Sequence, residues 1–170
     1  MNPHLFYVLF IALNIFVSMC PAHAAITTTT NVDGLTLQLS TKQDSYSTGD
    51  QIYVFLVVSN TTGKIASIGV FNDWQGGHVI PTFGEIRIIE LTSGKFIMPR
   101  KSAIIEGDDI GGEIGPTNSM QFKFNLFTDY SVTNAGNYSV SFRGQLKSPS
   151  NLGGKANFEL GPLFFQVTNK

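Results

Sequence analysis

Residues for thiol and metal chemistry are scarce in this sequence. The 170 residues include one cysteine, Cys20, and three histidines. Cys20 lies in an N-terminal segment with the features of an export signal, and removal of that segment leaves His78 as the single histidine. A zinc site of His and Cys usually needs three or four protein ligands. We therefore expect no such site, no cysteine nucleophile, no disulfide and no cofactor.

Sequence motifs for nucleotide binding and hydrolysis are also missing. Thr62-Gly63-Lys64 and Ser93-Gly94-Lys95 lack the upstream glycine and the following Ser or Thr of a Walker loop. No Gly-x-Ser-x-Gly elbow accompanies His78. The acidic residues are scattered, so no pair of carboxylates stands out as a glycosidase site. The sequence predicts a protein that is not an enzyme.

Charge of one sign is not concentrated anywhere in the chain. Eleven Lys and Arg and twelve Asp and Glu give a net charge of −1, and all of them follow residue 24, interspersed. Binding to a phosphate backbone requires a clustered basic surface. Nucleic acid is therefore not an expected partner.

The one long apolar run is at the N-terminus, Leu5–Met19. It is shorter than the roughly 20 apolar residues that a membrane-spanning helix needs. Pro21 breaks the run, and Ala22-His23-Ala24 supplies the small-x-small pattern that signal peptidases recognise. We expect residues 1–24 to be a helical secretory signal cleaved before Ala25. The protein would then be secreted or periplasmic and would meet a membrane only during export.

Two other interpretations of the N-terminus stay open. No Lys or Arg precedes the apolar run, so its positive charge comes from the free amine with help from His4. An uncleaved anchor is the first alternative. The second is a lipoprotein acylated at Cys20, although Met19 stands where a small residue is usual.

Short runs with a period of two dominate the rest of the chain, and no stretch shows helical spacing over three turns. Residues 25–33 are expected to form an extended leader, and residues 34–170 one domain. Ile52–Val58 is apolar on both faces, which predicts a central strand covered on both sides. The expected strands are Leu35–Ser40, Ile52–Val58, Lys64–Phe71, Glu85–Leu91, Lys95–Met98, Met120–Leu126, Tyr138–Arg143 and Leu163–Thr168.

Strands of this length and spacing predict an all-β fold, an immunoglobulin-like antiparallel β-sandwich of about 7–9 strands, or failing that a barrel. Tyr138 follows a turn and stands two residues before an inward position, as in the tyrosine corner of such sandwiches. An ordinary strand tyrosine is the other interpretation. Asn60-Thr61-Thr62 and Asn137-Tyr138-Ser139 match the glycosylation sequon, which matters only in a eukaryotic source.

Several segments together resemble a known class of module. They are Leu37–Asn60, with its Tyr-x-x-Gly-Asp turn, Phe122–Leu126, Tyr130–Val132 and Ala135–Val140. This pattern is similar to intracellular proteinase-inhibitor-type domains and to N-terminal modules of deuterolysin-like metallopeptidases. The peptidase half is absent, since no His-Glu-x-x-His occurs. The resemblance implies a free-standing sandwich that contacts another protein, and no functional residue carries over.

Two loops are candidate sites. Asn72–Gly84 holds the only tryptophan beside a Gly-Gly pair, and long loops with tryptophan are common at binding sites. The expected binding residues are Asp73, Trp74, Gln75 and His78. A tryptophan folded back as a lid on the core is the alternative.

The second loop, Glu106–Gly115, is acidic and rich in glycine. Asp108, Asp109 and Glu113 are calcium candidates because Ca²⁺ takes carboxylate oxygens. The spacing matches no EF-hand, and a solvated acidic turn is the simpler interpretation.

The leading functional hypothesis is a secreted or periplasmic, non-enzymatic binding module that acts on a protein partner, with inhibition as one form of that role. The first alternative is a structural or assembly protein, such as a surface-fibre subunit or its chaperone, that uses strand-edge pairing. A carbohydrate-binding or calcium-binding module is the second.

Overall fold

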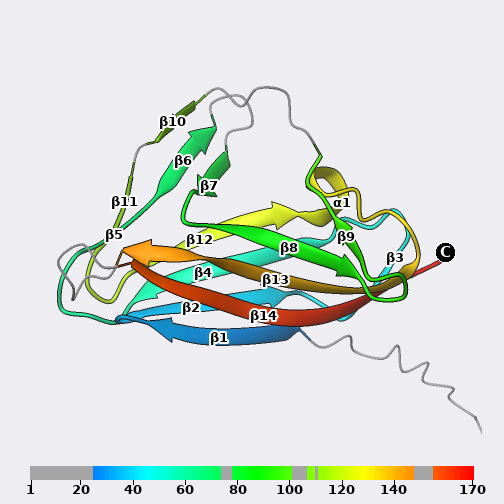
Figure 1. Cartoon of the computed structure of the whole chain (residues 1–170), viewed down its shortest axis with the longest axis horizontal. Coiled ribbons are helices and arrows are strands. Elements are labelled where there is room, and N and C mark those ends of the chain that lie inside the picture. The colour runs from blue at the N-terminus through cyan, green and yellow to red at the C-terminus, as the bar shows by residue number, and fades with distance from the viewer. Residues whose placement is uncertain (1–24, 74–77, 101–106, 110, 148–154) are drawn as a thin grey trace, which may run out of the picture.

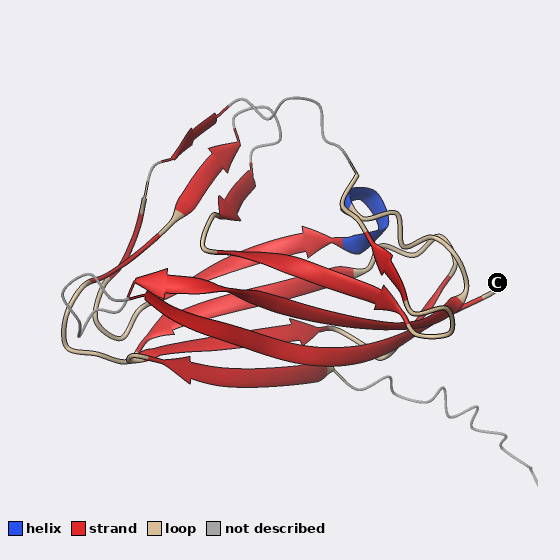
Figure 2. Cartoon of the chain, viewed as in Figure 1, coloured by secondary structure: helices blue, strands red, loops and turns tan. Residues whose placement is uncertain are grey.

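The computed structural model describes residues 25–73, 78–100, 107–109, 111–147 and 155–170. These parts form two β-sheets packed face to face, with a smaller arm of strands at one end (Figure 1, Figure 2). The one helix in the described ranges is α1 (Leu126–Asp129). None of the described helical structure is long or apolar enough to span a bilayer. The expected signal, residues 1–24, lies outside the described residues.

Sheet A has four antiparallel strands. In spatial order they are β1 (Ile26–Val32), β2 (Leu35–Thr41), β4 (Tyr53–Asn60) and β12 (Ser119–Asn125). Period-two alternation produces the sheet, because every second side chain of β2 and β4 is buried while the next is partly or fully exposed.

Sheet B has five strands. In spatial order they are β3 (Ser45–Ser47), β14 (Lys155–Thr168), β13 (Gly136–Lys147), β8 (Gly84–Glu90) and β9 (Lys95–Ile97). All neighbours are antiparallel except β3, which runs parallel to the end of β14. The expected hairpin of Glu85–Leu91 with Lys95–Met98 is confirmed as β8 and β9.

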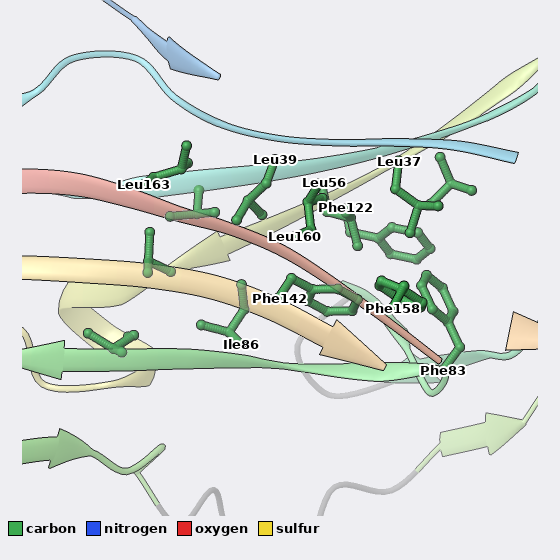
Figure 3. Close-up of a cluster of buried hydrophobic side chains, with 14 of the residues drawn as sticks. Leu37, Leu39, Leu56, Phe83, Ile86, Phe122, Phe142, Phe158, Leu160 and Leu163 are labelled. Carbon is green, nitrogen blue, oxygen red and sulfur yellow. The ribbon is translucent and has the colours of Figure 1, made fainter. Parts of the chain in front are cut away.

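The hydrophobic core fills the space between the sheets (Figure 3). Phe83 packs against several aromatic rings in this core. Its ring centroid lies 5.8 Å from that of Phe122 and 5.7 Å from that of Phe142. Phe142 also stacks on Phe158 at 5.9 Å. Because Phe122 belongs to sheet A and Phe142 to sheet B, the ring cluster joins the two layers. The chain is therefore all-β with a sandwich-like architecture, as the alternation predicted.

Residues 25–33, expected as an extended leader, are part of the sandwich. Ile26 to Val32 form β1, paired along its whole length with β2. The turn between them is Asp33-Gly34, and both residues have positive φ, 48° and 82°. Asp-Gly in a two-residue hairpin favours this left-handed pair. This dipeptide is therefore the sequence feature that predicts a β1–β2 hairpin in place of a leader.

Two further details differ from the sequence predictions. The expected strand Lys64–Phe71 is split at Gly69, whose carbonyl accepts a hydrogen bond of 3.0 Å from the Thr82 amide. The side of β4 that faces away from the core, expected to be covered, is only partly buried.

The tyrosine-corner hypothesis for Tyr138 is supported by a specific bond. The Tyr138 hydroxyl donates to the carbonyl of Asn134, four residues upstream, over 2.9 Å. The Tyr138 ring is buried and stacks on Phe165 with centroids 5.4 Å apart. The residue therefore fastens the turn before β13 to the core.

A small arm of five short strands rises from one end of the sandwich (Figure 1). They are β5 (Ala66–Ile68), β6 (Val70–Asp73), β7 (His78–Pro81), β10 (Gly107–Asp109) and β11 (Gly112–Ile114). In chain order the arm leaves sheet A after β4, enters sheet B at β8, and returns through β11 into β12. It thus connects the two layers.

Candidate functional site

The arm brings together the two loops that the sequence singled out. Asp73 pairs with His78 on one side and with Gly107 on the other, and Asn72 pairs with Asp108. The loop with the tryptophan and the acidic loop are therefore neighbours in one three-stranded sheet. Trp74 and Gln75 lie outside the described residues, as does the alternative of Trp74 as a lid.

The calcium candidates lie on two strands of the arm. Asp108 and Asp109 are in β10, which pairs with β6, and Glu113 is in β11, which pairs with β5. Their role as calcium ligands stays a prediction.

Asn60, at the end of β4, anchors the base of the arm. Its side chain is 1% exposed, and its amide nitrogen donates to the carbonyls of Lys64 at 2.7 Å and Ile114 at 2.8 Å. Its side-chain oxygen accepts from the Thr62 amide at 2.9 Å. Because both amide hydrogens point to buried carbonyls, a glycan on Asn60 is incompatible with this fold.

A second surface, which the sequence analysis did not identify, lies on the outer face of sheet B. The strand register puts Phe96 of β9 opposite Ile89 of β8, and Ile89 opposite Ser139 of β13. Ser139 in turn lies opposite Phe164 of β14. Leu91 extends the group, since its amide bonds to the Asn137 carbonyl just beyond β8. We call Ile89, Leu91, Phe96 and Phe164 the apolar row.

Sequence signals for the apolar row were present. Ile88-Ile89 and Phe164-Phe165 are apolar doublets within strands that otherwise alternate. Because neighbouring side chains of a strand point to opposite faces, one residue of each doublet must point away from the core. The structure buries Ile88 and Phe165 and exposes Ile89 and Phe164.

Charged side chains border the apolar row along the same face. The Arg87 guanidinium lies 5.7 Å from the centroid of the Phe96 ring. Glu85 accepts from the Nε of Arg87 at 3.1 Å and lies 3.7 Å from the Nε of Arg143. These pairs are largely exposed, so they add little stability, but they place both signs of charge beside an apolar surface.

An open groove of about 870 Å³ continues this face toward the arm. Its lining includes the charged Glu85 and Arg143 and the amides of Gln145 and Asn157. Those two amides hydrogen-bond to each other, with Gln145 Nε2 donating to Asn157 Oδ1 over 2.8 Å. The groove is open, with both polar and apolar lining, which suits contact with an extended surface better than enclosure of a small ligand.

The shifted pKa values in the described residues have structural causes. The Ser93 hydroxyl and the amides of Thr92 and Ser93 lower the pKa of Glu90 to about 2 while closing the β8–β9 turn. Burial, with Asp129 and Glu85 nearby, raises the pKa of Tyr130 to about 12. Within the described ranges, no three His, Cys, Asp or Glu side chains gather as a metal site.

Comparisons with known proteins give no family. No protein-family model and no curated protein matches the chain. Among solved structures, the C-terminal domain of wzt aligns over 88% of this chain and 83% of that chain, at 14% identity and a TM-score of 0.45. A β-glucosidase from Listeria innocua, in complex with gluconolactone, aligns over 85% of this chain but only 16% of its own, at 9% identity and a TM-score of 0.36.

Proposed function

We propose that this protein is an exported, non-enzymatic binding module that recognises a protein partner through the apolar row on the outer face of sheet B. The observation that carries the proposal is the exposure of four neighbouring large apolar side chains, between 38% and 55% each. Single exposed apolar residues are ordinary, whereas a contiguous group marks an interaction surface.

The composition of this face favours a protein as the partner. Ile89 and Leu91 carry no polar atoms in their side chains. Contact with another apolar surface lowers the free energy because it removes these side chains from water. Arg87, Glu85 and Arg143 border them with both signs of charge. An apolar centre with a polar, charged rim is the usual anatomy of a protein interface.

The arm is the second proposed contact region. Its binding residues are the four expected from the sequence, Asp73, Trp74, Gln75 and His78. Asp73 and His78 are the two of these in the described ranges, and their backbone pairing supports a shared site. The Tyr138 bond and the short antiparallel strands support an immunoglobulin-like sandwich, and the resemblance to proteinase-inhibitor-type domains makes a peptidase the first partner class to test.

The test is binding of one identified partner to matched variants of the exported protein. Phe164→Ser combined with Ile89→Ser should weaken the affinity at least about tenfold, because the central pair of the row is lost. Ile65→Ser is the matched control, since Ile65 is 61% exposed but lies outside the row. Equal affinity of the row variant and the control would refute the assignment of this face.

The arm is tested separately with Trp74→Ala and His78→Ala on the same partner. Weaker binding by this variant alone would move the site from the row to the arm. If row and arm variants both bind as tightly as the unmodified protein, neither surface is the protein-binding site.

Strand-edge assembly is the second candidate function, and β1 supports it. This edge strand has seven residues, contains no charge and no proline, and pairs with β2 without a bulge. Edges of this kind are normally blunted because they pair with other chains. Sedimentation of the purified protein tests it: self-association that Thr29→Pro abolishes supports assembly, and a monomer at high concentration contradicts self-assembly.

Export is tested by sequencing the N-terminus of the protein recovered from outside the cytoplasm. The expected first residue is Ala25. Cleavage there would keep all of β1, which begins at Ile26. A chain that begins at Met1 would support an anchor, and one that begins at an acylated Cys20 would support a lipoprotein.

A further inference from the structure

The outer face of sheet A carries a stripe of apolar side chains on its central strand. Tyr53, Phe55 and Val57 alternate with buried residues of β4 and are only half-buried. The Tyr53 and Phe55 ring centroids are 6.4 Å apart. Gln38, Gln121 and Lys123, on the same face, are exposed. The two adjacent rings are therefore partly accessible to a ligand.

Neutral hydrogen-bonding side chains flank this stripe in register. Val57 lies between Gln38 of β2 and Gln121 of β12. Phe55 lies between Ser40 and Lys123 on the same two strands. The edge strand β1 adds outward threonines, with Thr27 opposite Ser40. Amides thus lie on both sides of Val57, and Phe55 has a hydroxyl on its β2 side and Lys123 on its β12 side.

The charge of this face has one sign. The four strands of sheet A contain no Asp or Glu. Lys123 holds its ammonium 3.8 Å from the centroid of the Tyr53 ring, and Lys42 holds its own 5.9 Å from Phe55. Among the described residues, neither lysine has a carboxylate within 4.0 Å in a salt bridge. Within the described ranges, both ammonium groups lie beside the rings with no carboxylate paired to them.

We propose that the outer face of sheet A binds an acidic polysaccharide, one whose sugars carry carboxylates. The sugar rings would pack on Tyr53 and Phe55 as Lys42 and Lys123 move from the ring faces to the carboxylates. Their hydroxyls would bond to the flanking amides and hydroxyls, and their carboxylates would pair with Lys42 and Lys123. This is a binding site on the opposite layer from the apolar row, so it adds a second ligand to the proposed protein-binding function.

A glycan fits this face better than a folded protein does. The large apolar side chains that are most exposed in the described residues all lie outside sheet A. They are Ile65, Ile89, Leu91, Phe96, Met98 and Phe164. Sheet A instead offers two half-buried rings among uncharged polar groups, plus two cations. Ligands with many hydroxyls and spaced carboxylates match that composition, and their binding weakens with salt because the lysines are exposed.

The experiment measures binding of the whole exported protein to polygalacturonate and alginate, with neutral dextran and poly-glutamate as comparison ligands. We expect both acidic polysaccharides to bind, dextran not to bind, and poly-glutamate to bind more weakly because it offers no sugar face. Lys42→Gln combined with Lys123→Gln should lower the affinity about tenfold. Lys95→Gln combined with Lys155→Gln, on sheet B, is the matched control and should change it less than about twofold.

Phe55→Ser separates ring packing from charge. Its side chain is on the outer side of β4, so the core stays intact, and a thermal unfolding curve checks this. We expect it to weaken polysaccharide binding as much as the loss of the two lysines. Absence of binding to either acidic polysaccharide would overturn the proposal. So would equal loss in the Lys95 and Lys155 control, or binding to poly-glutamate at least as tight as to the polysaccharides.

Discussion

The side-chain amide of Asn60 donates a hydrogen bond to the main-chain carbonyl of Ile114, 54 residues away, over 2.8 Å. The same amide holds the Lys64 carbonyl at 2.7 Å. One buried polar side chain therefore joins the end of β4 to the segment just before β5 and to the last residue of β11. This contact fastens the base of the arm to the sandwich.

Replacement of Asn60 by alanine should destabilise the protein by roughly 2–3 kcal/mol, because it removes the buried bond to the Ile114 carbonyl and the acceptor of the Thr62 amide. Asn137→Ala is the matched control, since Asn137 is exposed at the start of β13. Chemical denaturation followed by circular dichroism measures both. A loss for Asn60→Ala no larger than that of the control would show that the amide bonds contribute nothing net.

Gly144→Ala should be among the most damaging single changes. A Cβ at Gly144 would lie 2.1 Å from the Phe83 carbonyl oxygen and 2.7 Å from the Gly84 Cα, and both are main-chain atoms that have little room to move. The expected cost is above about 3 kcal/mol or failure to fold. Gly63→Ala is the control, because a Cβ there meets nothing within 4 Å. Soluble yield and melting temperature distinguish the two variants, and similar values would contradict the close approach of β13 to Phe83.

Tyr138→Phe isolates the energy of the hydroxyl bond to Asn134. The ring and its stacking on Phe165 are retained, so only the bond of 2.9 Å is removed. We expect a loss of about 1 kcal/mol in the free energy of unfolding, measured in urea. An unchanged urea midpoint would mean that the hydroxyl is equally well satisfied by water.

Alkaline pH should weaken the fold through buried tyrosines. Burial, with help from Asp129 and Glu85, raises the pKa of Tyr130 from 10.0 to about 12. The folded state therefore holds this proton more tightly than the unfolded chain does. The resulting stability is complete below pH 10 and is lost as the pH rises toward 12.

Tyr130→Phe should make the loss of stability with rising pH less steep. The remaining loss comes from Tyr46 and Tyr138, whose pKa values are raised mainly by burial. Unfolding curves at a series of alkaline pH values measure the effect. A variant whose stability falls as steeply as that of the unmodified protein would rule Tyr130 out as a contributor.

Local patterns were enough to predict the sandwich strands. Alternation in Leu35–Ser40 and Met120–Leu126 placed the correct faces inward, and the turn between Leu91 and Lys95 gave the hairpin of β8 and β9. These features depend on residues two apart or on one tight turn, so the sequence contains them directly. Residues 26–32 form a strand and not a leader, because Asp33-Gly34 makes a tight turn that folds them back on β2.

The two proposed binding surfaces, one on each sheet, could not be predicted from local patterns. Ile89 and Phe164 are 75 residues apart in the sequence, and they share a face only because both pair with Ser139. The outward side of β4 looked like the inside of a protein because its residues are apolar on both faces. Whether another layer covers such a strand depends on the whole topology, which no single strand encodes.

The sequence by itself determined the strand content, the scarcity of catalytic residue types and the two loops of the arm, because composition and period-two spacing are local properties. Only the tertiary structure decided that those loops pair with each other, that Asn60 is a buried anchor and that the apolar row and the Tyr53–Phe55 stripe lie on opposite layers. Those relationships come from register between strands distant in sequence, which depends on packing of the whole core.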